Sequence, residues 1–291
     1  MRGFALRAAE LAGSVAGLAT AVLALAAGCA LLGVAAGGGG GAVVAIALAA
    51  VLVVFVFVGC ERMALSAMLG RPVSEVEHPA LYRLVRELSK DGRLPVPRLY
   101  LSPAEQPNAF AVGRGSRSAA ICCTEGLLEA LDEAELRGVL GHELAHVSGR
   151  DVLASTAAAG LATVITFPAM LPRLARHGAA EPGAAEKLLM LVFGPVAAVM
   201  VRLSVSRERE YRADASGALL TGDPLALARA LRKIEAGAVA LPLAPDGRRA
   251  SAGHLMVVSP FSPVGVTRLF LAHPPTGERI RRLEALAGYR R

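Results

Sequence analysis

The sequence carries no charged residue between Glu10 and Glu61, and a soluble domain of this size has no place to bury so long an apolar stretch. A run of glycines divides it into Leu11–Ala36 and Ala42–Cys60. Each piece approaches the roughly 20 residues with which an α-helix crosses the hydrocarbon core of a bilayer. A cleaved signal peptide has one short apolar core, whereas here a second follows directly. We therefore predict a transmembrane helical hairpin over residues 1–60.

Composition and charge agree with a membrane protein. The chain of 291 residues is 54% hydrophobic, with no Trp and a mean hydropathy of +0.50. Arg2 and Arg7 precede the hairpin, and Arg62 and Arg71 follow it, so the positive-inside rule predicts that both ends are cytoplasmic. The net charge of +7 suits a protein beside the anionic inner leaflet of the plasma (inner) membrane. No basic stripe alternates with aromatic residues, which argues against nucleic acid as a partner.

Two further apolar segments interrupt residues 61–291, which we predict to form the second domain. Residues 152–172 are uncharged and long enough for a third span. Residues 188–201 are shorter, which is more typical of an interfacial or core helix than of a full crossing. If both crossed, Arg173 and Arg176 would lie outside, against the positive-inside trend. Two-span and four-span topologies both remain open at this point.

The rest of the chain reads as a mainly α domain with a small β-sheet. Leucines and a valine at helical spacing predict a helix over His78–Leu88. Three short runs bounded by Pro, Gly and Ser predict strands at 98–101, 108–112 and 118–123, with a turn at 113–116. An open edge strand of this sheet would let an extended peptide pair with it through main-chain hydrogen bonds. Asp223 and Pro224 then mark the start of a helix that ends at about Ile234.

The segment from Asp132 to Gly149 contains the residues that indicate a catalytic metal site. Asp132 and Glu135 form a capping box, and apolar residues at helical spacing follow. His142 and His146 are four residues apart, so on a helix they share one face, with Glu143 beside them. Neutral imidazole nitrogens are good zinc ligands, but a catalytic zinc site needs three protein ligands with the fourth position left to water. This pattern therefore predicts half of a zinc site together with a general base.

A charged segment at 204–215 supplies candidates for the missing ligand. On a helix, Glu210 and Asp214 lie one turn apart on the same face. A carboxylate can complete a two-His zinc set, and a second one can accept the other ring N–H of a ligating imidazole. Glu210 is the better candidate ligand and Asp214 the better candidate for supporting a histidine. The alternative is a solvated helix whose charges pair with one another, and spacing alone leaves the two interpretations evenly balanced.

Cysteine and histidine elsewhere give weaker signals. Cys122 and Cys123 are adjacent, and the other two cysteines lie in apolar spans, so neither a disulfide framework nor a metal-binding C-x-x-C can be assembled. Small buried strand residues are the better interpretation of this pair, in a reducing cytosol. His273 precedes two prolines in a rigid loop, where a lone histidine is more often a surface residue than a functional one.

Taken together, HELAH at 142–146, EYRAD at 210–214, NAFA at 108–111 and HPP at 273–275 resemble the HtpX-type membrane zinc metallopeptidases, relatives of the CAAX prenyl proteases. The resemblance covers nearly the whole chain and implies a zincin-like fold with one zinc ion per subunit. It implies that the zinc is bound by His142, His146 and Glu210, with Glu143 as base and Asp214 supporting a ligand. It also implies that Asn108 and His273 face the substrate carbonyl and the tetrahedral intermediate.

These observations favour a zinc-dependent endopeptidase that acts on protein or peptide substrates. The resemblance implies that the substrates are membrane proteins under quality control. Charged residues within three turns before His142 argue against an intramembrane protease. Processing of prenylated tails is an alternative, although such enzymes usually have more spans. A non-catalytic membrane scaffold is a further alternative, and the intact set of His142, Glu143, His146 and Glu210 argues against it. The sequence does not indicate an oligomeric state.

Overall fold

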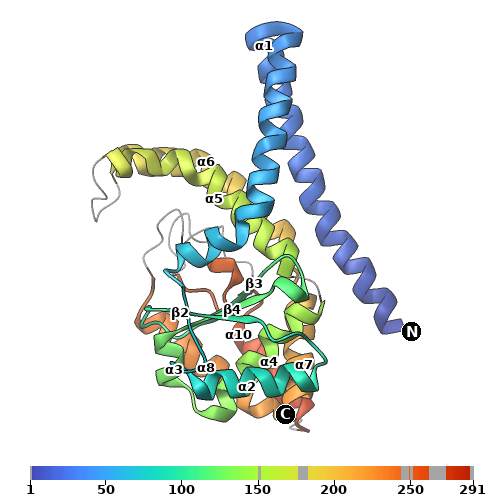
Figure 1. The fold of residues 1–291 in the computed structure, drawn as a ribbon, viewed down its shortest axis with the longest axis vertical. Helices are drawn as coiled ribbons and strands as arrows, with labels where there is room; N and C mark the ends of the chain where they lie inside the picture. The colour runs from blue at the N-terminus through green and yellow to red at the C-terminus, as the bar shows by residue number, and fades with distance from the viewer. Residues whose placement is uncertain are drawn as a thin grey trace.

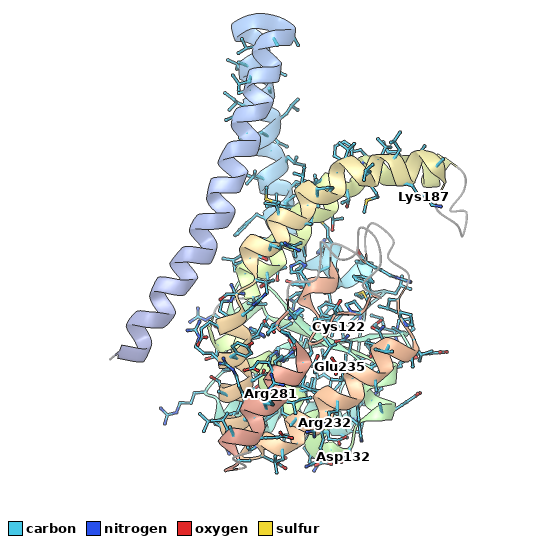
Figure 2. The ribbon with its side chains drawn as sticks, turned by 180° about the vertical axis from the view of Figure 1, so that it is seen from behind. Cys122, Asp132, Lys187, Arg232, Glu235 and Arg281 are labelled. Atoms are coloured by element: carbon cyan, nitrogen blue, oxygen red, sulfur yellow. The ribbon has the colours of Figure 1, made fainter. Side chains whose placement is uncertain are left out.

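The computed structural model describes residues 2–149, 152–175, 183–243, 249, 252–261 and 273–288. Figure 1 shows two helical hairpins that project from one end of a compact domain. In Figure 2 the charged side chains of Arg232 and Arg281 and the carboxylate of Asp132 lie on the domain at the end remote from the hairpins, whereas Lys187 lies at the far tip of one hairpin. The polar domain and the apolar hairpins are therefore segregated, as a membrane protein requires.

The first hairpin is α1 (Arg2–Ala67), in which the helix is broken at Gly37 and Gly38. Gly38 has φ +60°, a conformation that glycine adopts without strain, and the chain reverses there (Figure 1). A Cβ on Gly41 would lie 2.1 Å from the carbonyl oxygen of Gly33, so glycine also allows the two arms to approach closely. The turn is thus shorter than the predicted run of glycines, and Gly39 already belongs to the second arm.

The second arm of α1 continues past residue 60 to Ala67 instead of ending at the predicted boundary. Leu65 in the last turn of α1 and Met68 just after the helix pack with Phe110 and Cys122 of the sheet. The segment Gly33–Ala67 is long and apolar enough to cross a membrane. One helix therefore connects the membrane hairpin rigidly to the domain, because no loop intervenes.

The second hairpin consists of α5 (Val152–Ala175) and α6 (Ala184–Ser204), which lie side by side (Figure 1). Within α5, Val152–Ala169 is long and apolar enough to span a membrane. Helix α6 has 21 residues, but its uncharged part, residues 188–201, is short as expected. Among the described residues it meets the length and hydropathy of a membrane span only together with α7, from which it is bent by 51°. Gly160 of α5 packs closely against Cys60 and Val56 of α1.

The domain contains a mixed four-stranded sheet in the order β1-β2-β4-β3. β2 (Arg98–Ser102) pairs in parallel with β4 (Ala120–Thr124), which pairs antiparallel with β3 (Ala109–Val112). The short β1 (Arg71–Pro72) borders β2. The 3₁₀-helix η1 (Ser116–Ser118) lies in the connection between β3 and β4. The three predicted strands are confirmed, although the last begins at Ala120, and β3 lies at an edge of the sheet.

Helices cover both faces of this sheet. One face packs with α2 (Pro79–Asp91), α4 (Glu133–Gly149) and α8 (Pro224–Ala240) in the main core. The predicted stripe on α2 is confirmed, since its leucines and Val85 are buried in this core. The other face packs with the end of α1 and with residues 252–256. The remaining helices of the described domain are α3 (Glu125–Ala130), α7 (Arg207–Thr221) and α10 (Thr276–Leu286).

The outer edge of β3 is partly covered by residues 252–258, which we call the strap. The strap begins with the 3₁₀-helix η2 (Gly253–Leu255). The backbone N–H of Val257 donates a 3.0 Å hydrogen bond to the Ala109 carbonyl of β3. The Asn108 side-chain amide donates a 2.8 Å hydrogen bond to the Val258 carbonyl. The edge strand was expected to be open, and the structure corrects this, because the strap already satisfies one of its outward-facing carbonyls.

Candidate metal centre

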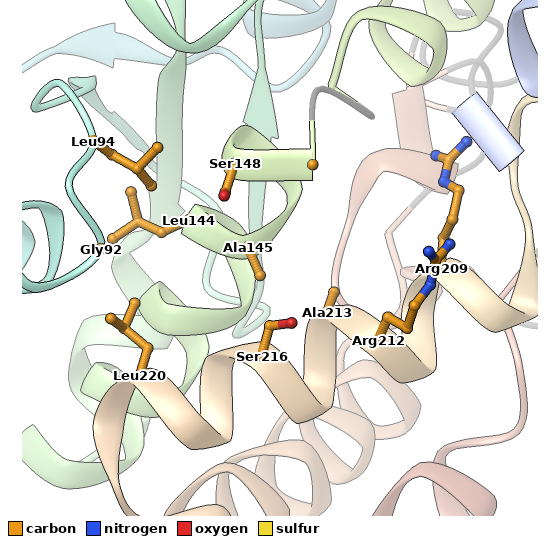
Figure 3. Close-up of a pocket in the computed structure, with 11 residues that line it drawn as sticks. Gly92, Leu94, Leu144, Ala145, Ser148, Arg209, Arg212, Ala213, Ser216 and Leu220 are labelled. Atoms are coloured by element: carbon orange, nitrogen blue, oxygen red, sulfur yellow. The ribbon is translucent and has the colours of Figure 1, made fainter. Parts of the chain in front are cut away.

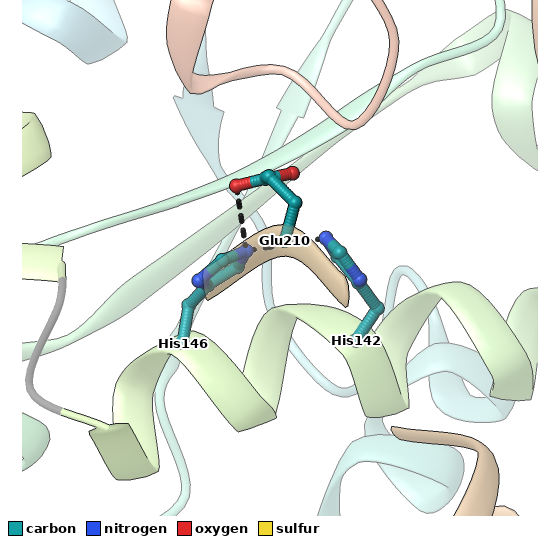
Figure 4. Close-up of side chains that lie close together, drawn as sticks. All are labelled: His142, His146 and Glu210. Carbon is teal, nitrogen blue, oxygen red and sulfur yellow. Dashed lines mark hydrogen bonds and ion pairs between the residues drawn. The ribbon is translucent and has the colours of Figure 1, made fainter. Parts of the chain in front are cut away.

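Helix α4 presents the two histidines as their spacing predicts. The capping box is confirmed, since the Glu135 N–H donates to Asp132 Oδ1 and the Asp132 N–H donates to Glu135 Oε2. His142 and Glu143 are each 1% exposed, because α4 lies between the sheet and α7. His142 and His146 point the same way from one face of α4 (Figure 4). The helix therefore fixes two imidazoles in a buried position before any other element contributes.

Helix α7 brings the acidic residues to these histidines by a close crossing with α4. A Cβ on Gly217 would lie 2.6 Å from the backbone nitrogen of His142, and one on Gly141 would lie 2.9 Å from Thr221 Cγ2. Only glycine at these two positions lets the helix axes approach so closely. Glu210 is 4% exposed and Asp214 3%, whereas Glu208 is exposed to solvent. The solvated-helix interpretation of this segment is therefore wrong, because its carboxylates at 210 and 214 are buried.

Three donor atoms converge on one point. The Nε2 atoms of His142 and His146 are 3.2 Å apart, and His146 Nε2 lies 3.6 Å from Glu210 Oε1 (Figure 4). The potential ligand atoms of His142, His146 and Glu210 all lie within 4.8 Å of one another. Ligands at about 2.0–2.2 Å from a tetrahedral zinc ion would be separated by roughly 3.3–3.5 Å. The arrangement therefore has the dimensions of a tetrahedral metal site.

Asp214 determines which nitrogen of His142 is available. Its Oδ1 lies 2.9 Å from His142 Nδ1, so the ring N–H faces the carboxylate and the Nε2 lone pair faces the donor set. Burial alone would raise the pKa of Asp214, but the Arg279 guanidinium beside it lowers the pKa to about 2. Burial lowers the pKa of His142 below its usual value. The pair is therefore an ionised carboxylate next to a neutral imidazole, as a metal ligand must be.

The carboxylates of this cluster favour a bound cation. Glu210 and Asp214 are buried carboxylates whose pKa is lowered, and Arg279 pairs with Asp214. A divalent ion in the donor set would lie against the Glu210 carboxylate, so it fits the site in charge as well as in dimensions. Imidazole nitrogen with a carboxylate oxygen is the donor set of catalytic zinc sites.

Glu143 lies next to the donor set, at the edge of the sheet. Burial raises its pKa to about 7, although the His146 ring and the backbone amide of Ala111 act in the opposite direction. Both Glu143 and Ala111 line the same small cavity as the donor histidines. Because a general base works best with a pKa near the operating pH, this carboxylate is suited to taking a proton from water.

His273 reaches the centre from the loop before α10. Its Nδ1 lies 3.0 Å from Glu210 Oε2 and its Nε2 lies 2.8 Å from the His254 carbonyl oxygen. Both neighbours are hydrogen-bond acceptors, so His273 donates to them through its ring N–H groups. The interpretation of His273 as a bland surface residue is wrong, because the structure places it against a candidate metal ligand.

Asn108 is placed differently from the expectation that it faces the substrate. Its side chain is completely buried, Nδ2 donates to the Val258 carbonyl, and Oδ1 accepts from the Ala109 amide. It does not line the cavity that holds the donor atoms. In this structure the Asn108 side chain therefore holds the strap against the edge of β3, because its amide donates to the Val258 carbonyl.

The cavity at the donor atoms has a volume of about 20 Å³. A water molecule needs roughly 10–15 Å³ by this measure, so the cavity takes an ion or a water but not a peptide. A cleft of about 150 Å³ lies on another face of the α4–α7 pair, between leucines at one end and arginines at the other (Figure 3). It contains none of the candidate ligands, so this cleft is not the chemical centre.

Two residues of the site were missed from the sequence. Arg279 forms a bidentate ion pair with Asp214, and His254 lines the cavity from the strap. An Arg six residues after His273 gives no signal by itself, because charged residues of a terminal helix are usually exposed. His254 stood in a segment with no recognisable motif. Neither spacing nor periodicity could have identified them, since each reaches the site from a distant part of the chain.

Comparisons with known proteins show which family this chain resembles. The model of peptidase family M48 matches residues 75–287. A protein of Kineococcus radiotolerans described as "Protease HtpX homolog" is 53% identical over 236 residues, covering 79% of this chain and 80% of its own length. A protein of Bifidobacterium longum with the same description is 46% identical over 78% of this chain and 76% of its own. The crystal structure of S. mikatae Ste24p aligns with 97% of this chain and 65% of its own length, at a TM-score of 0.44 and 17% identity.

Proposed function

Because this chain belongs to peptidase family M48 and is a membrane metalloprotease, we propose that it is a zinc-dependent endopeptidase whose metal is held by His142, His146 and Glu210. The observation that carries the proposal is the convergence of their three donor atoms beside the buried carboxylate of Glu143. A zinc ion bound there would polarise the scissile carbonyl and acidify a water molecule. One ion per subunit follows from the single cluster of this kind among the described residues.

Glu143 is proposed to move the proton. Its carboxylate takes the proton from the attacking water and later delivers it to the leaving amine. A carboxyl whose pKa burial raises to about 7 can both accept and release a proton near neutral pH. Asp214 keeps His142 in the tautomer that ligates, because its ionised oxygen holds the Nδ1 proton.

We propose that the substrate pairs in extended form with β3. Ala109 and Ala111 direct their main-chain groups outward, since Asn108 and the residues that alternate with it pair with β4. Ala111 also lines the metal cavity, so a peptide paired there would pass beside Glu143. The strap has to leave Ala109 before a longer peptide can pair along the full edge, because the Val257 amide occupies that carbonyl.

His273 is proposed to stabilise the negative charge that develops on the scissile carbonyl oxygen. A ring N–H in the cavity would be a hydrogen-bond donor for this oxygen, and the prolines after His273 restrict the loop. Asn108 is proposed to contact the substrate main chain only once the strap has moved and released its amide. Both roles remain separate from metal binding, which the other three side chains supply.

The relatives named "Protease HtpX homolog" favour general proteolysis over the processing of prenylated tails. We propose that the enzyme lies in the plasma (inner) membrane with its active site on the cytoplasmic side, and that it cleaves damaged or misassembled membrane proteins. The arginines that flank the first hairpin support this orientation. We also propose that residues 1–60 act as the membrane hairpin and residues 61–291 as the peptidase domain.

The test compares the parent with Glu143→Gln. The amide keeps the shape of the side chain but cannot accept the proton, so the variant should bind zinc stoichiometrically and lose cleavage of casein. Metal analysis and peptide release are measured on the same preparations. Cleavage at the parental rate by Glu143→Gln would refute the mechanism, and absence of metal in the parent would refute the metal site.

A further inference from the structure

Arg279 connects two parts of the site that are otherwise separate. Among the residues that the structure describes it is the largest fully buried side chain, at 1% exposure, and it comes from α10. Its Nε and Nη2 donate to the two carboxylate oxygens of Asp214 at 2.8 and 2.7 Å. Its Nη1 donates to the carbonyl oxygen of Val257 at 2.5 Å. One guanidinium therefore contacts both the carboxylate behind His142 and the strap that covers β3.

The planar guanidinium is needed for this arrangement. A bidentate contact fixes the plane of a carboxylate, whereas an ammonium group makes a single point contact. Asp214 Oδ1 is shared between Arg279 Nη2 and His142 Nδ1, at 2.7 and 2.9 Å. The orientation of this carboxylate thus sets the direction of the His142 ring, and with it the direction of the Nε2 lone pair.

The third contact reaches the edge strand. Val257 accepts from Arg279 through its carbonyl and donates to Ala109 through its amide. The next residue, Val258, accepts from the Asn108 side chain. A displacement of the strap therefore removes one acceptor of Arg279, and a displacement of Asp214 removes the other two.

We propose that Arg279 is a positioning residue that orients His142 through Asp214 and couples this orientation to the strap on the edge strand. The proposal rests on the proposed metal site. It predicts that the geometry of the metal and the order of the strap change together, because they share one side chain. Arg279 itself does not contact substrate or metal.

The experiment compares Arg279→Lys with the parent and with Arg282→Lys. Arg282 lies on the same helix but is exposed, stacks on Tyr211 and contacts Glu278, so its variant controls for a general effect on α10. Zinc affinity is measured by competition with a chelator, and the geometry by the absorption spectrum of the cobalt-loaded protein. Arg279→Lys should bind zinc about 10- to 100-fold more weakly and show an altered cobalt spectrum. Arg282→Lys should match the parent in both.

A second measurement uses the parent alone and does not depend on the folding of a variant. Loading with zinc should slow hydrogen exchange at the Val257 amide, because the metal orders His142, Asp214 and Arg279 in turn. The Val73 amide, which donates to Leu99 in the sheet, should be unchanged. Parental affinity and spectrum in Arg279→Lys, or equal exchange at Val257 with and without zinc, would overturn the proposal. A failure of the proposed function would appear separately, as a parent without bound metal or cleavage.

Discussion

The protonation state of Glu143 is subject to two opposing effects, its burial and its role as a base. Burial favours its protonated form, with a pKa of about 7, whereas its role as base requires the ionised form. A divalent ion in the adjacent donor set favours ionisation, because opposite charges attract strongly in a buried environment. Metal binding and the loss of the Glu143 proton are therefore thermodynamically linked.

This linkage predicts proton release on zinc binding. At about pH 6 the metal-free protein holds the Glu143 proton, since this pH lies below the raised pKa. Zinc binding should therefore release close to one proton more in the parent than in Glu143→Gln, which has no such proton to lose. Calorimetry in buffers of different ionisation enthalpy measures the difference. Equal proton release from the two proteins would show that Glu143 is already ionised without metal.

The assignment of Glu210 as the third ligand leads to a second prediction. Glu210 is buried against His146 and His273, whereas Glu208, two residues earlier, is exposed. Glu210→Ala should lose stoichiometric zinc, and Glu208→Ala should retain it, because the two side chains leave α7 on different faces. Metal content after dialysis decides between them. Retention of zinc by Glu210→Ala with loss in Glu208→Ala would mean that the ligand had been wrongly assigned.

Among the structural elements, the strap has the clearest functional consequence. It occupies the Ala109 carbonyl that a substrate strand would use, and the cavity beneath has no room for a peptide. The free energy of strap release is therefore subtracted from that of substrate binding. A single main-chain hydrogen bond contributes about 0.5–1.5 kcal/mol, so weakening the strap should measurably favour substrate entry.

Val257→Pro tests this competition. Proline removes the N–H that binds Ala109, and Met256 already has φ −73° and ψ 150°, which suits a residue before proline. The kcat/KM for an unstructured peptide should rise by about 2- to 10-fold, as expected from the loss of one hydrogen bond. The rise should disappear in the Glu143→Gln background. A fall in kcat/KM with unchanged zinc content would instead mean that the strap forms part of the substrate site.

Across the whole molecule, both hairpins project from the same end of the domain and the N-terminus lies on the domain side of α1 (Figure 1). Because α1 runs outward and back, the N-terminus and the domain are on one side of the membrane that it crosses. We propose that this side is the cytoplasm, because the arginines that flank the hairpin favour that orientation. The catalytic cluster would then meet its substrates at the inner surface of the membrane.

Cysteine labelling tests this topology. In a variant without native cysteines, a single Cys at Ser74 should resist a membrane-impermeant thiol reagent in intact cells, because the proposed orientation places this position behind the membrane. Ser74 is exposed on the surface of the domain, so burial in the protein would not explain the resistance. A single Cys at Gly39, beside the reversal of α1, should react. Permeabilised cells provide the control for both positions. Labelling at Ser74 in intact cells would place the domain outside and contradict the proposed orientation.

Features that depend on near neighbours along the chain could be predicted from the sequence. The spacing of His142 and His146, the capping box before them and the uncharged stretch after Glu10 each express a local rule of helix geometry or membrane solvation. The strands were predictable for the same reason, because Pro and Gly mark where they begin and end. The family resemblance used the same local motifs and pointed to the metallopeptidase fold and activity that the family match confirms.

The contacts between distant segments could not be predicted from the sequence and are seen only in the folded molecule. Arg279 pairs with Asp214 across 65 residues, and Asn108 holds Val258 across 150. Such contacts leave no periodicity in the sequence, since they depend on how α7, α10 and the strap pack around α4. The glycines at the α4–α7 crossing show the physical reason. Their effect lies in the distance that they allow between two helices, and that distance exists only once both helices are packed.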